Sequence, residues 1–157
     1  MTRPSADPSG VLNQQRQVPI AVAPMERFLA RVHRRLRLRR GAVCVSLVSP
    51  ARIARWNRSY RGKNKPTDVL SFPIEDRDAS GRAARRPSPA KREYLGDIAI
   101  APAVAKRNAR RFGRAFDDEM RILVLHGVLH LMGYDHETDR GQMDRIERKL
   151  RREMGLE

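Results

Sequence analysis

The chain has 157 residues, enough for one domain with its own core and short for two. Its 33 Lys and Arg against 18 Asp and Glu give a net charge of +15, an excess that attracts polyanions such as nucleic acid. No apolar run approaches the roughly 18 residues that span a bilayer, and the first ten residues lack the apolar segment of a secretory signal, so we expect a cytoplasmic protein that makes no use of a membrane.

The first half of the chain predicts a tail followed by alternating strands and helices. Residues 1–10 are rich in Pro, Ser and Gly and are expected to form a flexible tail. Apolar residues recur at helical spacing from Pro24, and this helix is expected to end at Gly41, with His33 exposed among arginines and without a role. The other elements expected here are an edge strand within 11–17, a strand over 42–48, a helix over 51–60 capped by Ser49, and a strand over 69–73.

The second half predicts a long loop and three further helices around one more strand. Residues 75–93 are polar and lack any period, so they are expected to form a mobile loop. The helix expected over 119–132 is apolar on nearly every side and must therefore be buried. The remaining elements are a strand over 94–102, a helix over 103–111, and a last amphipathic helix over 139–154. This irregular mixture predicts a single α+β domain over residues 11–157 rather than a parallel βαβ array.

The positive charge gathers in three stretches of sequence. Arginine and lysine are concentrated in residues 31–40, 82–92 and 106–111. None of these stretches contains an interleaved aromatic residue, so contact with phosphates is the expected use and base stacking is not. Charge alone also fits a solvated surface, and it does not distinguish RNA from DNA.

Three of the four histidines fall within the eleven residues HGVLHLMGYDH, from His126 to His136. His126 and His130 are four residues apart and project from one face of the expected helix. Gly133 is placed to end that helix in a left-handed turn, after which His136 can fold back toward them. Three imidazoles with a fourth position open predict a catalytic metal site, with zinc favoured over nickel or copper. The alternative is three core histidines bonded to backbone carbonyls.

Two acidic residues are candidates for a supporting role at this site. Asp135 precedes His136 and either orients an imidazole or forms the turn. Asp97 is a charged residue in the middle of an expected strand and is either structural or a partner of a ligand.

The histidine spacing of four and then six also matches the metzincin protease pattern H-E-x-x-H-x-x-G-x-x-H. In the protease the general base is the Glu after the first His, and here that position is Gly127. A glycine inside a helix costs about 1 kcal/mol against Ala, which suggests that another chain segment approaches closely. A metalloprotease-like hydrolase therefore stays open as an alternative without its usual base.

HGVLHLMGYDH resembles the signature of the YbeY family of metal-dependent endoribonucleases. NRSYRGKNKPTDVLSFP at 57–73 and YLGDIAI at 94–100 are similar to further hallmarks of that family, which usually has Asp where this chain has Asn64. The resemblance implies a zincin-like fold with a mixed sheet of about four strands. It implies zinc ligands at His126, His130 and His136, and an arginine important for activity at Arg61.

The resemblance also implies a substrate. It points to an endoribonuclease that prefers single strands and acts in maturation of the 16S rRNA 3′ end and in quality control of the small ribosomal subunit. Lys63 and Lys65 share the loop after Arg61 and are candidate contacts to the RNA backbone. A third possibility is a ribosome-assembly factor without catalysis, in which zinc only stabilises the fold.

Overall fold

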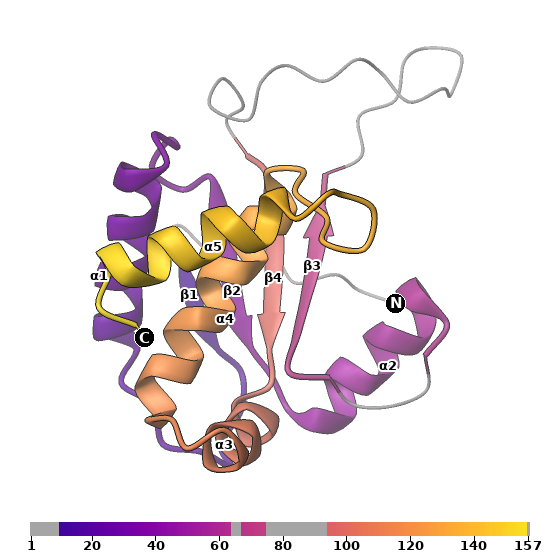
Figure 1. Ribbon diagram of the computed structural model, residues 1–157. Helices are drawn as coiled ribbons and strands as arrows, with labels where there is room; N and C mark the ends of the chain where they lie inside the picture. Colours follow the sequence, from indigo (N-terminus) through magenta and orange to yellow (C-terminus); the bar gives the residue numbers. More distant parts are fainter. Residues whose placement is uncertain (1–9, 64–66, 75–93, 157) are drawn as a thin grey trace.

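A computed structural model describes residues 10–63, 67–74 and 94–156 (Figure 1). Most of the expected tail and the whole of the expected 75–93 loop lie outside these residues. Within the described part of the chain, no helix is both long and apolar enough to cross a membrane.

A four-stranded mixed sheet forms the centre of the fold, in the order β1-β2-β4-β3. The first three strands in this order are parallel, and β3 is antiparallel to β4. Val45 on β2 lies opposite Val11 on β1 and Ile98 on β4. The strands are β1 (Val11–Asn13), β2 (Val43–Leu47), β3 (Val69–Pro73) and β4 (Gly96–Ile100). The predicted α+β class, with about four strands, is confirmed.

Helices cover both faces of this sheet. Figure 1 shows α4 lying over β2 and β4, with α5 crossing it, and α2 beside β3. Side chains alternate along the strands, so Ile98 and Ile100 join the core under α4, whereas Ala99 joins the smaller core under α2. The described helices are α1 (Val22–Arg35), α2 (Pro50–Arg61), α3 (Pro102–Arg111), α4 (Phe116–Leu131) and α5 (Gln142–Glu153).

Helix α1 ends at Arg35 rather than next to Gly41, so the predicted end was wrong. Arg37 takes the left-handed conformation that normally favours glycine, with φ of 56°. Its backbone N–H bonds to Arg34, and the N–H of Leu38 bonds back to the carbonyl of His33, which completes a Schellman cap. Leu38 is buried in the main core, so its packing outweighs the cost of the conformation of Arg37. No glycine occupies the left-handed position at this helix end, and the sequence therefore predicted the end of α1 at the next glycine, Gly41, which is too late.

The prediction that His33 is exposed was also wrong. His33 is only 6% exposed, and its Nε2 atom has no hydrogen-bond partner among the described residues. Burial lowers the pKa of its imidazole below the ordinary value, because the charged form would lose its hydration.

His33 should therefore make the fold sensitive to acid. Above the ordinary histidine pKa, folded and unfolded chains both hold a neutral imidazole, and the residue has no pH-dependent effect. As the pH falls below that value, the unfolded chain takes up a proton that the folded chain resists, so the free energy of unfolding decreases. We expect the stability advantage of His33→Leu over the wild type to grow between pH 7.5 and 5.5 in urea titrations of metal-free protein. If the free energy of unfolding changes by the same amount in both proteins over this pH range, the expectation is contradicted.

Candidate metal centre

Helix α4 carries the first two histidines of the cluster, and its burial fixes their direction. Its side chains are buried on nearly every side, as the sequence predicts, between the sheet and α5. His126 and His130 lie one turn apart and are half-buried, with ring centroids 4.6 Å apart. Both rings face the cleft described below.

The turn after α4 brings the third histidine to the other two. Gly133 has φ of 103°, and the N–H of Tyr134 bonds back to the carbonyl of Leu129, so the helix ends in the predicted left-handed turn. The ring of His136 then lies 5.6 Å from that of His126 and 5.4 Å from that of His130. One nitrogen of each ring lies within 4.8 Å of the others, and in the described residues this group contains no further His, Cys, Asp or Glu.

Hydrogen bonds at the back of the rings determine which nitrogens face each other. The Nδ1 atom of His130 lies 3.0 Å from the carbonyl oxygen of Tyr134, and that of His126 lies 2.7 Å from a carboxylate oxygen of Glu147. A carbonyl and an ionised carboxylate only accept, so both Nδ1 atoms must donate. In the neutral rings, each Nε2 atom is then left with a lone pair.

These two lone pairs point at each other. The Nε2 atoms of His126 and His130 are 3.1 Å apart, and two neutral rings in these tautomers cannot share a hydrogen bond there. Two nitrogens bound tetrahedrally to one zinc ion at about 2.0–2.1 Å would be about 3.3 Å apart. The donor set and its spacing therefore fit a metal ion, with the turn residue His136 as the third ligand.

The pKa of His130 lies below its ordinary value. Burial is the main cause, and the positive charges that His126 and His136 can carry add to it. A ring that resists protonation remains neutral at pH 7, which is the form that binds a metal.

Glu147 is the site residue that the sequence reading missed. It lies on α5, is 9% exposed, and accepts from His126 and from Arg151 at 3.1 Å. Burial alone would raise the pKa of Glu147, but the bond from His126 and the charges of His126 and Arg151 outweigh burial and lower it. A signal was present in the sequence, because Glu147 falls at core-facing spacing between the apolar residues Met143 and Leu150.

We expect Glu147→Gln to weaken zinc binding by about 10- to 100-fold, because His126 loses the charged acceptor that fixes its tautomer. Competition with a chromogenic chelator measures this affinity. Glu153→Gln is the matched control, since Glu153 is on the same helix and pairs with Arg35 away from the site. Equal affinities for the Glu147 and Glu153 variants would contradict a role for Glu147 in holding His126.

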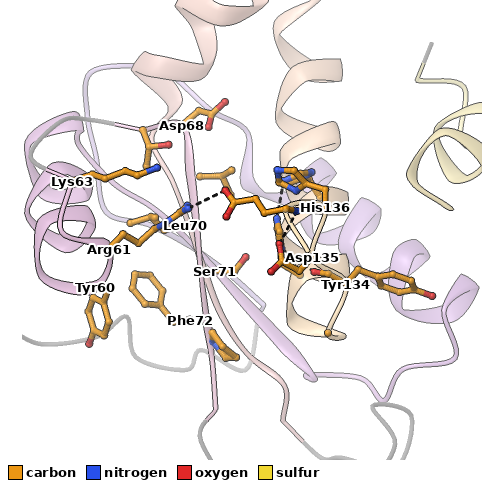
Figure 2. A pocket seen from close by; sticks show the side chains of 17 residues that line it. Tyr60, Arg61, Lys63, Asp68, Leu70, Ser71, Phe72, Tyr134, Asp135 and His136 are labelled. Carbon is orange, nitrogen blue, oxygen red and sulfur yellow. Dashed lines mark hydrogen bonds and ion pairs between the residues drawn. The ribbon is translucent and has the colours of Figure 1, made fainter. Parts of the chain in front are cut away.

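A cleft of about 620 Å³ opens in front of the three histidines. Its opposite side is formed by the end of α2, the segment after it, and β3 (Figure 2). Arg61 is the last residue of α2, and its guanidinium lies 3.7 Å from the carboxylate of Glu137. Lys63 also lines the cleft, whereas Lys65 lies outside the described residues.

The two acidic candidates lie in different surroundings. Asp135 lines the cleft, and its side chain accepts from the backbone N–H of Glu137 at 3.0 Å, as a turn-forming residue does. This bond is the main cause of the lowered pKa of Asp135, and charge on His130 and His136 also contributes. Asp97 is buried in β4, accepts from the hydroxyl of Tyr94, and is not among the residues that line the cleft.

Gly127 allows α4 to lie close to the sheet. A Cβ atom at this position would lie 2.8 Å from the side chain of Ile98 on β4, closer than such atoms normally come. The close approach suggested by the sequence is therefore present, and the position of the protease base points into the core. A carboxylate side chain fits there only if the side chain of Ile98 or the helix itself shifts.

A family model described as Endoribonuclease YbeY matches residues 11–155. Endoribonuclease YbeY of Koribacter versatilis is 43% identical over 118 residues, covering 74% of this chain and 67% of that protein. The protein of the same name from Solibacter usitatus is 41% identical over 133 residues, covering 84% and 78%.

A solved structure supports the same relationship. The solution structure of TM1509 from Thermotoga maritima aligns with a TM-score of 0.53 and 29% identity, over 88% of this chain and 83% of that one. The α+β fold is thus found in a related sequence.

Proposed function

The chain belongs to the YbeY family of endoribonucleases and has the family's zincin-like fold, and from that premise we propose that it hydrolyses single-stranded RNA at the centre formed by His126, His130 and His136. The observation that carries this proposal is that the Nε2 atoms of His126 and His130 lie 3.1 Å apart with their lone pairs facing each other. The family and the histidine group support a metal-dependent enzyme, and the finer assignment of one zinc ion per chain is ours.

The three imidazoles would hold the ion, and their hydrogen bonds would keep them in place. Such an ion supplies Lewis-acid chemistry at a phosphodiester. Glu147 fixes the tautomer of His126, and the carbonyl of Tyr134 fixes that of His130. We propose that Asp135 acts by holding the turn before His136, and that Asp97 acts at most through its place in β4.

Arg61 is proposed to bind a non-bridging phosphate oxygen and to stabilise the negative charge that develops at phosphorus. Its side chain is 47% exposed, and its ion pair with Glu137 is long and exposed. Such a pair contributes about 0–1 kcal/mol, so a phosphate can replace Glu137 at little cost. Lys63 and Lys65 are proposed to contact the neighbouring phosphates.

The natural substrate is proposed to be rRNA, with the 3′ end of 16S rRNA on the small ribosomal subunit as the site of cleavage. We propose the cytoplasm as its place of action, because ribosomes mature there. Residues 11–157 would act as one catalytic domain. The net charge of +15 is suited to a polyanionic substrate and not to a protease with ordinary protein substrates.

The test is metal removal and return. We expect chelated protein to lose cleavage of a single-stranded RNA and to regain it with zinc, while a matched duplex is cut more slowly and casein is not cut. Metal content is measured on the same samples. Casein digestion that depends on metal would favour the metalloprotease instead. RNA binding with full zinc content but no cleavage would favour an assembly factor in which zinc is structural.

A further inference from the structure

A second hollow, of about 330 Å³, adjoins the metal centre and is called here the α3–α4 hollow. Its residues come from the end of α3 and the segment after it, from one face of α4, and from α5: Phe112, Arg114, Glu119, Ile122, Leu123, His126 and Arg151. Asp68, Val69 and His126 line both this hollow and the cleft. The two depressions therefore meet at the metal centre, and the proposed cleavage uses only the cleft.

The α3–α4 hollow contains an exposed aromatic ring. Phe112 is 60% exposed, and the guanidinium of Arg114 lies over its ring at 5.7 Å. In the described part of the chain, Tyr60 is the only other large hydrophobic residue that is exposed, and it lines the cleft. The two exposed rings thus lie in the two depressions that meet at His126. Scattered surface residues would not be expected to coincide with the site in this way.

The surroundings of Phe112 are positively charged. Residues 106–121 contain six Lys or Arg and three Asp or Glu. Two of the three acids are paired with arginines, Glu119 with Arg114 and Asp118 with Arg121. The four basic residues of α3 are all exposed. Phe112 directly follows the third basic stretch, so an aromatic residue is available beside charges that the sequence reading assigned to phosphate contact alone.

We propose that the α3–α4 hollow is a nucleotide subsite, in which a base of the single-stranded RNA stacks on Phe112 and Arg114. The inference rests on the proposed function and extends it. Glu119, which pairs with Arg114, and His126 both line the hollow and are seven residues apart on α4. This separation is about 10 Å, which corresponds to about three stacked nucleotides at about 3.4 Å each. The strand continues past His126 into the cleft, where Arg61 holds its phosphate. A duplex cannot use this subsite, because its bases are already stacked.

Binding of a labelled single-stranded RNA to zinc-loaded protein tests the subsite. The measurements are made in an Arg61→Ala background, which slows cleavage of the RNA and removes the same phosphate contact from every variant compared. We expect Phe112→Ala to weaken binding by about 5- to 150-fold, the range that stacking of one base gives. Phe112→Tyr should bind within about 2-fold of its parent, since the ring is kept. Binding of duplex RNA should not change, and melting temperature and zinc content should match the parent because the side chain is exposed.

A second measurement is independent of affinity. Phe112→Trp places an indole in the hollow, and single-stranded RNA should quench its fluorescence, with buried Trp56 as a constant background. Unchanged single-strand affinity in Phe112→Ala, or an equal loss for duplex, overturns the subsite even if the wild type cuts RNA. Conversely, a selective loss in a protein whose wild type cuts no RNA supports the subsite and removes the proposed function.

Discussion

His130→Ala is expected to abolish stoichiometric zinc binding and to reduce RNA cleavage by at least about 10³-fold. Two nitrogens would remain, and a two-coordinate protein site does not hold zinc as three imidazoles do. Loss of the ion removes several kcal/mol of charge stabilisation at phosphorus, and about 4 kcal/mol corresponds to the stated factor. Metal analysis and single-turnover cleavage of a short RNA measure the two effects on the same protein.

The remaining histidine of the chain provides the control. His33 is outside the site, so His33→Leu should keep its zinc and its cleavage rate at pH 7.5. The proposal is wrong if His130→Ala retains one zinc per chain, or if it loses zinc and still cleaves at the wild-type rate.

Arg61→Ala is expected to slow cleavage by about 10²- to 10³-fold, as removal of one charge-stabilising donor does in other hydrolases. Zinc content should not change, because the guanidinium lies across the cleft from the histidines (Figure 2). Arg61→Lys should recover only part of the rate, since an ammonium lacks the planar pair of donors. Single-turnover rates at saturating RNA separate this effect from weaker binding.

Arg58→Ala is the matched control for net charge. Arg58 is exposed on the same helix, one turn before Arg61, and does not line the cleft. Both variants lose one positive charge, so a general effect on RNA attraction would appear in both. If the two variants cleave at similar rates, Arg61 acts only as part of the basic surface.

Much of the fold could be predicted because its signals are local. The apolar residues of α4 lie on nearly every side of the helix, and the N–H of Arg52 donates to the hydroxyl oxygen of Ser49, which caps α2 as expected. The ends of β2, β3 and β4 were predicted within about two residues, the usual error at element ends, and β1 occupies the first three residues of its 11–17 window. The end of α1 was the main error, because the left-handed position is Arg37 rather than a glycine.

In the candidate site too, features set by local spacing could be predicted, and those set by packing between distant elements could not. The convergence of His126, His130 and His136 depends on helix periodicity and one glycine turn, all within eleven residues, so spacing alone predicts it. Glu147 is 21 residues from His126 and reaches it only because α5 packs across α4. Periodicity marks Glu147 as core-facing and does not identify the group it meets.

By itself, then, the sequence determined the elements and the histidine group, since these depend on residues close together in the chain, and Arg61 became a candidate through the resemblance of its motif to a known family. Only the tertiary structure decided that His33 is buried and that the carboxylate of Glu147 fixes the tautomer of His126. It also decided that Phe112 adjoins the metal centre. The physical reason is that burial and hydrogen-bond partners depend on which faces of distant elements pack together, and local periodicity contains no information about that choice.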